Sequence, residues 1–171
     1  MTKEEIKATA RNEENILTFS IYSKAFDKEM LQRIYIPTLN WQTGEQEQDL
    51  NKIVTNYVTD CINNFLELDK SKFIDKLKDE IYKIFEIVIE ATSYAQVPDE
   101  LIKKHGNTEA NRIFFNGMTK DSVFSTCNFY EAYYTQDSGP ELRFSVFVNI
   151  DWESEHGLRL FFENGHLVNI E

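Results

Sequence analysis

A short acidic run near the C-terminus holds the side chains best suited to chemistry, which are Asp151, Glu153, Glu155 and His156. If the run is extended, alternate residues point the same way, so the three carboxylates share one face. Carboxylates at this spacing beside an imidazole could bind a divalent cation or hold a general base. The other interpretation is a solvated acidic rim on a structural hairpin, whose side chains contact a partner. We favour the rim, and we assign no metal ligand and no catalytic residue.

The neighbours of this run support the structural interpretation. Trp152 continues the inward-facing register of Ile150, so it is expected in the core rather than beside a ligand. Gly157 is expected to supply a backbone conformation that other residues resist. The sequence therefore predicts a hairpin with a charged edge.

Other residues with catalytic or ligating side chains form no recognised motif. The spacing of the three His is unlike a zinc site, and the sequence contains no CxxC pair, P-loop or nucleophile elbow. His166 is expected to lie across a strand pair from Glu163. Cys61 and Cys127 are interpreted as reduced structural thiols. The sequence thus favours a protein that is not an enzyme and uses no cofactor.

An aromatic run lies in the last third of the chain and comprises Phe124, Phe129, Tyr130, Tyr133 and Tyr134. Aromatic side chains fill ordinary sheets and are also enriched in the cores of interfaces. No basic residue interleaves with them along the chain, which argues against a platform for stacking bases. Two interpretations stay open, core packing and a seam between two copies of the chain.

Hydrophobic periodicity predicts the elements that position these residues. Strict alternation over 142–150 is the clearest strand pattern, and Asn164-Gly165 is a typical two-residue hairpin turn. Spacing by three and four residues predicts helices over 50–65 and 74–92, which the short linker should join as an antiparallel helical hairpin. Further strands are predicted over 14–22, 30–36, 122–134, 158–162 and 167–170, and a short helix over 98–105. The fold class is α+β, with a mostly antiparallel sheet of about five to six strands packed on a two-helix hairpin, in a single domain over 1–171.

The composition fits one acidic folded domain. The chain has 171 residues, of which 42% are hydrophobic, and a formal net charge of −11. Such a charge repels nucleic acid and anionic membranes and attracts basic proteins. The charged N-terminus lacks an apolar signal core, and no apolar tract is long enough to cross a bilayer. We expect a cytoplasmic protein that binds neither nucleic acid nor membranes.

The C-terminal hairpin resembles a bacterial family of unknown function. The resemblance rests on residues 151–158, 161–165 and 167–168. Members of that family end in a W-D-x-E-H-G-L stretch, a strand, a tight turn and a last strand, and Glu153 stands here where Asp is usual. The resemblance does not assign an activity to the chain, and it identifies no catalytic residue. Small acidic α+β domains of this type are similar to immunity proteins of bacterial toxin systems.

Three functions stay open. The favoured one is a protein-binding module, in particular an immunity-type inhibitor of a basic toxin, with Asp151, Glu153, Glu155 and His156 as its contact surface. The second is a metal-dependent hydrolase that uses Asp151, Glu155 and His156. The third is a self-associating structural domain with the aromatic run as a homodimer seam. The net charge, the missing catalytic motifs and the resemblance favour the first.

Overall fold

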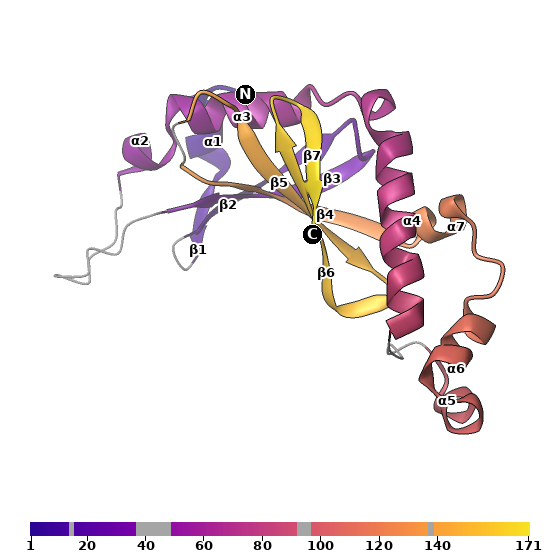
Figure 1. The fold of residues 1–171 in the computed structure, drawn as a ribbon. Coiled ribbons are helices and arrows are strands. Elements are labelled where there is room, and N and C mark those ends of the chain that lie inside the picture. The colour runs from indigo at the N-terminus through magenta and orange to yellow at the C-terminus, as the bar shows by residue number, and fades with distance from the viewer. Residues whose placement is uncertain (14–15, 37–48, 92–96, 137–138) are drawn as a thin grey trace.

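The strands of the sheet lie side by side in the order in which they occur along the chain (Figure 1). The computed structural model describes residues 1–13, 16–36, 49–91, 97–136 and 139–171, without the side chains of residues 13, 91 and 153–156. The strands form one 7-stranded sheet. They are β1 (Arg11–Glu13), β2 (Ile16–Ser23), β3 (Lys28–Tyr35), β4 (Cys127–Tyr134), β5 (Arg143–Ile150), β6 (Glu153–Glu163) and β7 (His166–Ile170).

Neighbouring strands are antiparallel except at one place, where β3 and β4 run parallel. Parallel neighbours need a long crossover, and most of the helices lie in this connection. Helix α1 (Lys3–Thr9) precedes the sheet. The crossover contains α2 (Leu50–Ile53), α3 (Asn56–Leu66), the 3-10 turn η1 (Lys70–Lys72), α4 (Ile74–Ala91), α5 (Asp99–His105), α6 (Asn107–Phe114) and α7 (Lys120–Ser125).

The hydrophobic core lies between one face of the sheet and helices α3 and α4. The apolar stripe of α3 includes Phe65, whose ring meets Phe144 of β5 edge-on at 5.7 Å between centroids. The stripe of α4 includes Phe85, whose ring meets Trp152 edge-on at 5.4 Å. The predicted α+β class and the mostly antiparallel sheet are confirmed. Both predicted apolar stripes pack in the core, but the helix predicted over 50–65 is divided into α2 and α3.

The predicted antiparallel helical hairpin is wrong. Figure 1 shows that α3 and α4 run in clearly different directions across the sheet instead of side by side. Between them, the buried Phe73 packs edge-on against Phe162 of β6 at 5.4 Å, which fixes the connection to the sheet. Each helix therefore buries its stripe against the strands and not against the other helix. The predicted end of the second helix at Thr92 lies outside the described residues.

The predicted number of strands, about five to six, is also corrected, because the short β1 pairs with β2 and makes seven. The expected strand over 122–134 begins only at Cys127, since Lys120–Ser125 form helix α7. Residues 14 and 15 of the predicted first strand lie outside the described residues. In the last third, β5, β6 and β7 follow the predicted strands, and both turn residues Asn164 and Gly165 have positive φ, at 49° and 78°.

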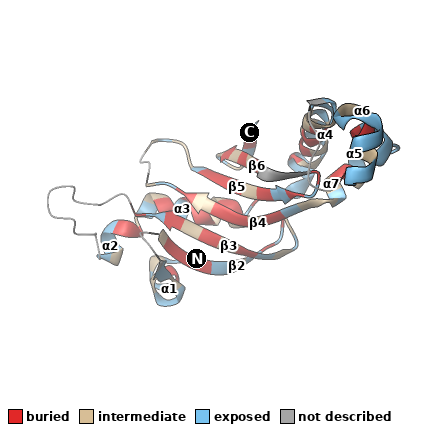
Figure 2. Ribbon diagram, turned by 90° about the horizontal axis from the view of Figure 1, so that it is seen from below, coloured by how far each residue is buried: buried red, intermediate tan, exposed pale blue. Residues whose placement is uncertain are grey.

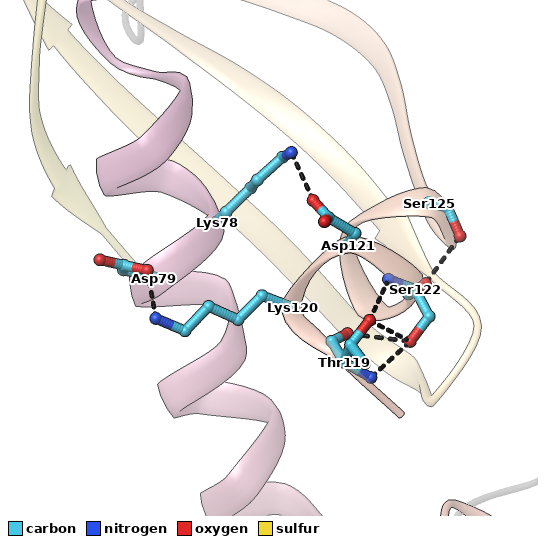
Figure 3. Close-up of polar contacts among 7 residues, drawn as sticks. All are labelled: Lys78, Asp79, Thr119, Lys120, Asp121, Ser122 and Ser125. Atoms are coloured by element: carbon cyan, nitrogen blue, oxygen red, sulfur yellow. Dashed lines mark hydrogen bonds and ion pairs between the residues drawn. The ribbon is translucent and has the colours of Figure 1, made fainter. Parts of the chain in front are cut away.

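A capping box explains why α7 is a helix although the sequence predicts a strand from residue 122 (Figure 3). The Thr119 amide donates to Ser122 Oγ at 2.6 Å, and the Ser122 amide donates to Thr119 Oγ1 at 3.3 Å. Two of the first amides that a helix leaves unpaired are satisfied in this way. Two ion pairs then join α7 to α4, from Lys78 to Asp121 at 2.5 Å and from Lys120 to Asp79 at 2.6 Å.

Candidate functional site

The acidic run near the C-terminus is the contact surface that the sequence predicts. Asp151 is exposed in the turn between β5 and β6. The backbone of Glu153, Glu155 and His156 belongs to β6, but these three side chains lie outside the described residues. The prediction that they form one contact surface with Asp151 therefore stays a prediction. Within the described part of the chain, no group of three His, Cys, Asp or Glu side chains could hold a metal ion.

Two structural predictions about this hairpin are confirmed. Trp152 is buried, with 1% of its surface exposed, and it packs against α4. Gly157 has a φ of 64°, and a Cβ there would lie 2.7 Å from the Val148 carbonyl oxygen. The register also places His166 opposite Glu163, as expected. The hairpin is therefore built by packing and by backbone geometry.

The face of the sheet that points away from α3 and α4 is the more distinctive surface. Figure 2 shows strands β2 to β6 from this side, and no described helix lies over them. The strand register places two rows of residues side by side here, the first from β3 to β7 and the second from β4 to β6. One row is Arg33, Tyr133, Ser145, Phe161 and Asn169, and the next is Glu131, Phe147 and Arg159. We call this surface the open face.

Arg159 is held at the centre of the open face by aromatic rings. Its guanidinium carbon lies 4.9 Å from the centroid of Phe161, 5.0 Å from that of Phe147 and 5.8 Å from that of Tyr133. Its Nε donates a hydrogen bond to Ser145 Oγ at 3.0 Å, and Ser145 is buried. A cation over ring faces is attracted by their quadrupoles, so both the plane and the position of the guanidinium are fixed. We call these five residues the Arg159 cluster.

Ion pairs flank the Arg159 cluster on two sides. Arg33 Nε lies 2.6 Å from Glu131 Oε2, and the Glu131 side chain is only 11% exposed. On the other side, Arg143 lies 3.2 Å from Glu163 and 3.3 Å from Glu141. Tyr133 lies near both Arg33 and Arg159, and burial raises the pKa of its phenol. The charges of Arg33 and Arg143 are thus balanced locally by carboxylates.

A hollow of about 360 Å³ lies beside the cluster, over β4 to β7. Its lining includes Tyr133, Phe161 and Arg159, and it extends to Val168 at the outermost strand. Small-molecule sites typically span 300–1,000 Å³ and combine apolar walls with a few polar groups. The hollow has this size and lining, and it is open to solvent on the exposed side of the sheet.

The aromatic run predicted from the sequence divides between the two faces of β4. Phe129 and Tyr134 are buried toward the helices, and the Tyr134 hydroxyl donates to Gln32 Oε1 at 2.6 Å. Tyr133 points to the open face. No basic residue interleaves with the aromatics along the chain, but the fold places Arg159 of β6 over Tyr133. The sequence contains one indication of this surface. Phe147 and Phe161 occupy solvent-side positions in two strands whose residues otherwise alternate between apolar and polar.

Burial suppresses the reactivity of the Cys127 thiol at the start of β4. Cys127 pairs with Ile150, and burial, with a smaller effect of the Asp151 charge, raises the pKa of its thiol to about 12. Because the thiolate is the reactive form, we expect iodoacetamide at pH 8 to alkylate native Cys127 about a hundredfold more slowly than an ordinary cysteine. A mass-spectrometric time course checks this, with the urea-unfolded chain as the control. Equal rates in the native and unfolded chains would contradict it.

The fold and the open face define a class of protein, an α+β domain whose described helices cover one side of the sheet and leave the other side open. The chain belongs to the family described as Domain of unknown function (DUF6985), whose model matches residues 13–171. Searches of the curated proteins and of the solved structures returned no match. Membership of an uncharacterised family is thereby confirmed, whereas the C-terminal signature and the likeness to immunity proteins stay predictions. None of the described helices has the length and apolarity needed to span a bilayer.

Proposed function

We propose that this chain is a protein-binding module whose contact surface is the open face. The observation that carries the proposal is the Arg159 cluster, an arginine fixed among three aromatic rings on an uncovered side of the sheet. Residues that dominate binding energy in protein interfaces are enriched in Tyr, Trp and Arg. Ordered side chains also lose less entropy on binding than mobile ones, so a prearranged cluster supports affinity.

The net charge of −11 supports a basic partner and hence the particular form of an immunity-type inhibitor of a basic toxin. A net negative field accelerates encounter with a cationic protein, and salt weakens that effect. The close contact is made by local groups, and a basic protein still presents aromatic, apolar and acidic side chains. Long-range attraction and the chemistry of the contact are therefore separate in this proposal. Asp151, Glu153, Glu155 and His156 would supply a second, acidic contact near the end of β6.

Site-directed photocrosslinking in the native host tests the proposal. A photoreactive phenylalanine replaces Tyr35, which is 45% exposed next to the open face, or Phe114, which is 41% exposed on α6. The two positions are matched in exposure and aromatic type, and they differ in the surface they report. We expect an adduct with one basic protein at position 35 and none at position 114.

The purified partner then serves for direct titration at low and high salt, where we expect weaker binding at high salt. Adducts at neither position, or the same adducts at both, would contradict the open face as the contact surface. An adduct with a second copy of the chain at position 35 would replace the proposal by self-association. An adduct with nucleic acid would likewise overturn it.

A further inference from the structure

We infer that the hollow beside Arg159 binds the carboxylate of an aspartate or glutamate side chain that a protein partner presents between apolar residues. The inference rests on the proposed function and adds the chemistry that the open face recognises. It depends on three features of the Arg159 cluster: the unused edge of the guanidinium, the charge balance around it and the shape of the hollow.

The guanidinium of Arg159 is oriented with one edge available. Its Nε is occupied by the hydrogen bond to Ser145 Oγ at 3.0 Å. Among the described residues, no hydrogen bond is made by its two terminal nitrogens. Arginine binds a carboxylate through two parallel N–H donors of this kind, and the rings of Phe147 and Phe161 keep the plane fixed for that contact.

Arg159 also differs from the other two arginines of the open face in its charge balance. Arg33 faces Glu131 at 2.6 Å, and Arg143 faces Glu163 and Glu141. Within the described part of the chain, Arg159 forms no ion pair. A partner carboxylate would therefore complement the central charge without displacing a carboxylate of the chain itself.

The hollow is larger than a carboxylate, and its surface is mainly apolar. A volume of about 360 Å³ leaves space for an apolar side chain next to the acidic one. Burial of such a side chain against Tyr133 and Phe161 would supply hydrophobic free energy that an ion pair at the surface lacks. A single anionic group flanked by apolar residues thus fits better than a polyanion, which the charge of −11 also repels.

A side-chain carboxylate fits better than the carboxyl terminus of a chain. Terminal carboxylates are typically captured by clusters of backbone N–H groups. The hollow lies over strands β4 to β7, of which β4, β5 and β6 pair with a neighbouring strand on both sides and β7 pairs with β6. Arg159 is then the principal donor, and it provides the two-point contact that an acidic side chain accepts.

A peptide titration monitored by NMR tests the inference, first on the unaltered chain and then on two variants. The probes are two capped tripeptides, Leu-Glu-Leu and Leu-Gln-Leu, which have the same shape and differ by one charge. We expect the glutamate peptide to shift the Arg159 Nε–Hε signal and to bind about tenfold more tightly than the glutamine peptide. Arg159→Lys keeps the charge but lacks the two-nitrogen edge, so most of that tenfold preference should disappear, followed through the Phe161 amide. Arg112→Lys on α6, where Arg112 pairs with Glu90, is the matched control and should keep it.

Equal affinity for the two peptides, or no shift with either at millimolar concentration, overturns the inference. A thymidine oligonucleotide that shifts the Arg159 signal at lower concentration than the glutamate peptide also overturns it, in favour of nucleic acid. The proposed function and this inference can fail independently. Crosslinks at position 35 together with equal affinities for the two peptides would support the open face as an interface and contradict the binding of a carboxylate there.

Discussion

Trp152→Ala is expected to lower the free energy of unfolding by about 3–5 kcal/mol, the range found when a buried aromatic side chain is truncated. Trp152 is 1% exposed and lies in the turn between β5 and β6. Its ring meets Phe85 of α4 edge-on at 5.4 Å, so it joins the C-terminal hairpin to the longest helix. The variant loses apolar burial, this ring contact and the packing of α4 at once. Urea unfolding followed by circular dichroism measures the loss.

Two further variants make this prediction specific. Tyr35→Ala removes an exposed aromatic ring, and its effect on stability should stay within about 0.5 kcal/mol. Trp152→Phe keeps a ring in the core and removes an indole N–H that no described residue accepts, so it should cost clearly less than Trp152→Ala. A loss for Trp152→Ala no larger than that for Tyr35→Ala would show that Trp152 is not a core anchor.

The helices and strands were predictable where periodicity and turn chemistry agree. Alternation over 142–150 predicts β5, and the Asn164-Gly165 turn predicts the register that places Glu163 opposite His166. Helix α7 escaped prediction because its Phe124 continues the aromatic run of the following strand β4, whereas the Thr119–Ser122 capping box decides for a helix. A polar contact of two side chains outweighed a hydrophobic pattern there.

The arrangement of the elements was less predictable, because it depends on contacts between distant segments. The parallel pairing of β3 with β4 joins strands that lie almost a hundred residues apart, and no local pattern encodes it. The directions of α3 and α4 depend on the sheet as a third partner, while a short linker predicts only that two helices follow one another. The hydrophobic effect favours burial of the apolar stripe of each helix, but it does not specify which element covers that stripe.

The Arg159 cluster shows why the candidate site could not be predicted from spacing. Its members come from β4, β5 and β6, and a shift of one residue in any of these strands would move them to opposite faces. Register shifts occur between Phe129 and Glu131 and between Val148 and Ile150, so the alignment cannot be counted from the turns. The acidic run stands out in the sequence because its residues are adjacent in the chain, whereas the open face is assembled by strand pairing.

Gly157→Ala should test the backbone conformation that sets this pairing. A side chain at position 157 meets two penalties, a φ of 64° and a contact of 2.7 Å between Cβ and the Val148 carbonyl oxygen. The first costs about 1–2 kcal/mol in a non-glycine residue. The second requires the backbone of β5 or β6 to move, so we expect a total loss of about 3 kcal/mol in urea unfolding.

Gly117→Ala separates the two penalties. Gly117 has a φ of 81°, but a Cβ there would meet nothing within 4 Å, so this variant should lose only about 1–2 kcal/mol. Gly157 also precedes Arg159 by two residues in β6, so a displaced strand should move the guanidinium away from the rings of Phe147 and Phe161. The Arg159 Nε–Hε signal should therefore shift in Gly157→Ala and stay in place in Gly117→Ala. Equal losses of stability in the two variants, with an unmoved Arg159 signal in both, would mean that the close approach to Val148 does not set the register of the open face.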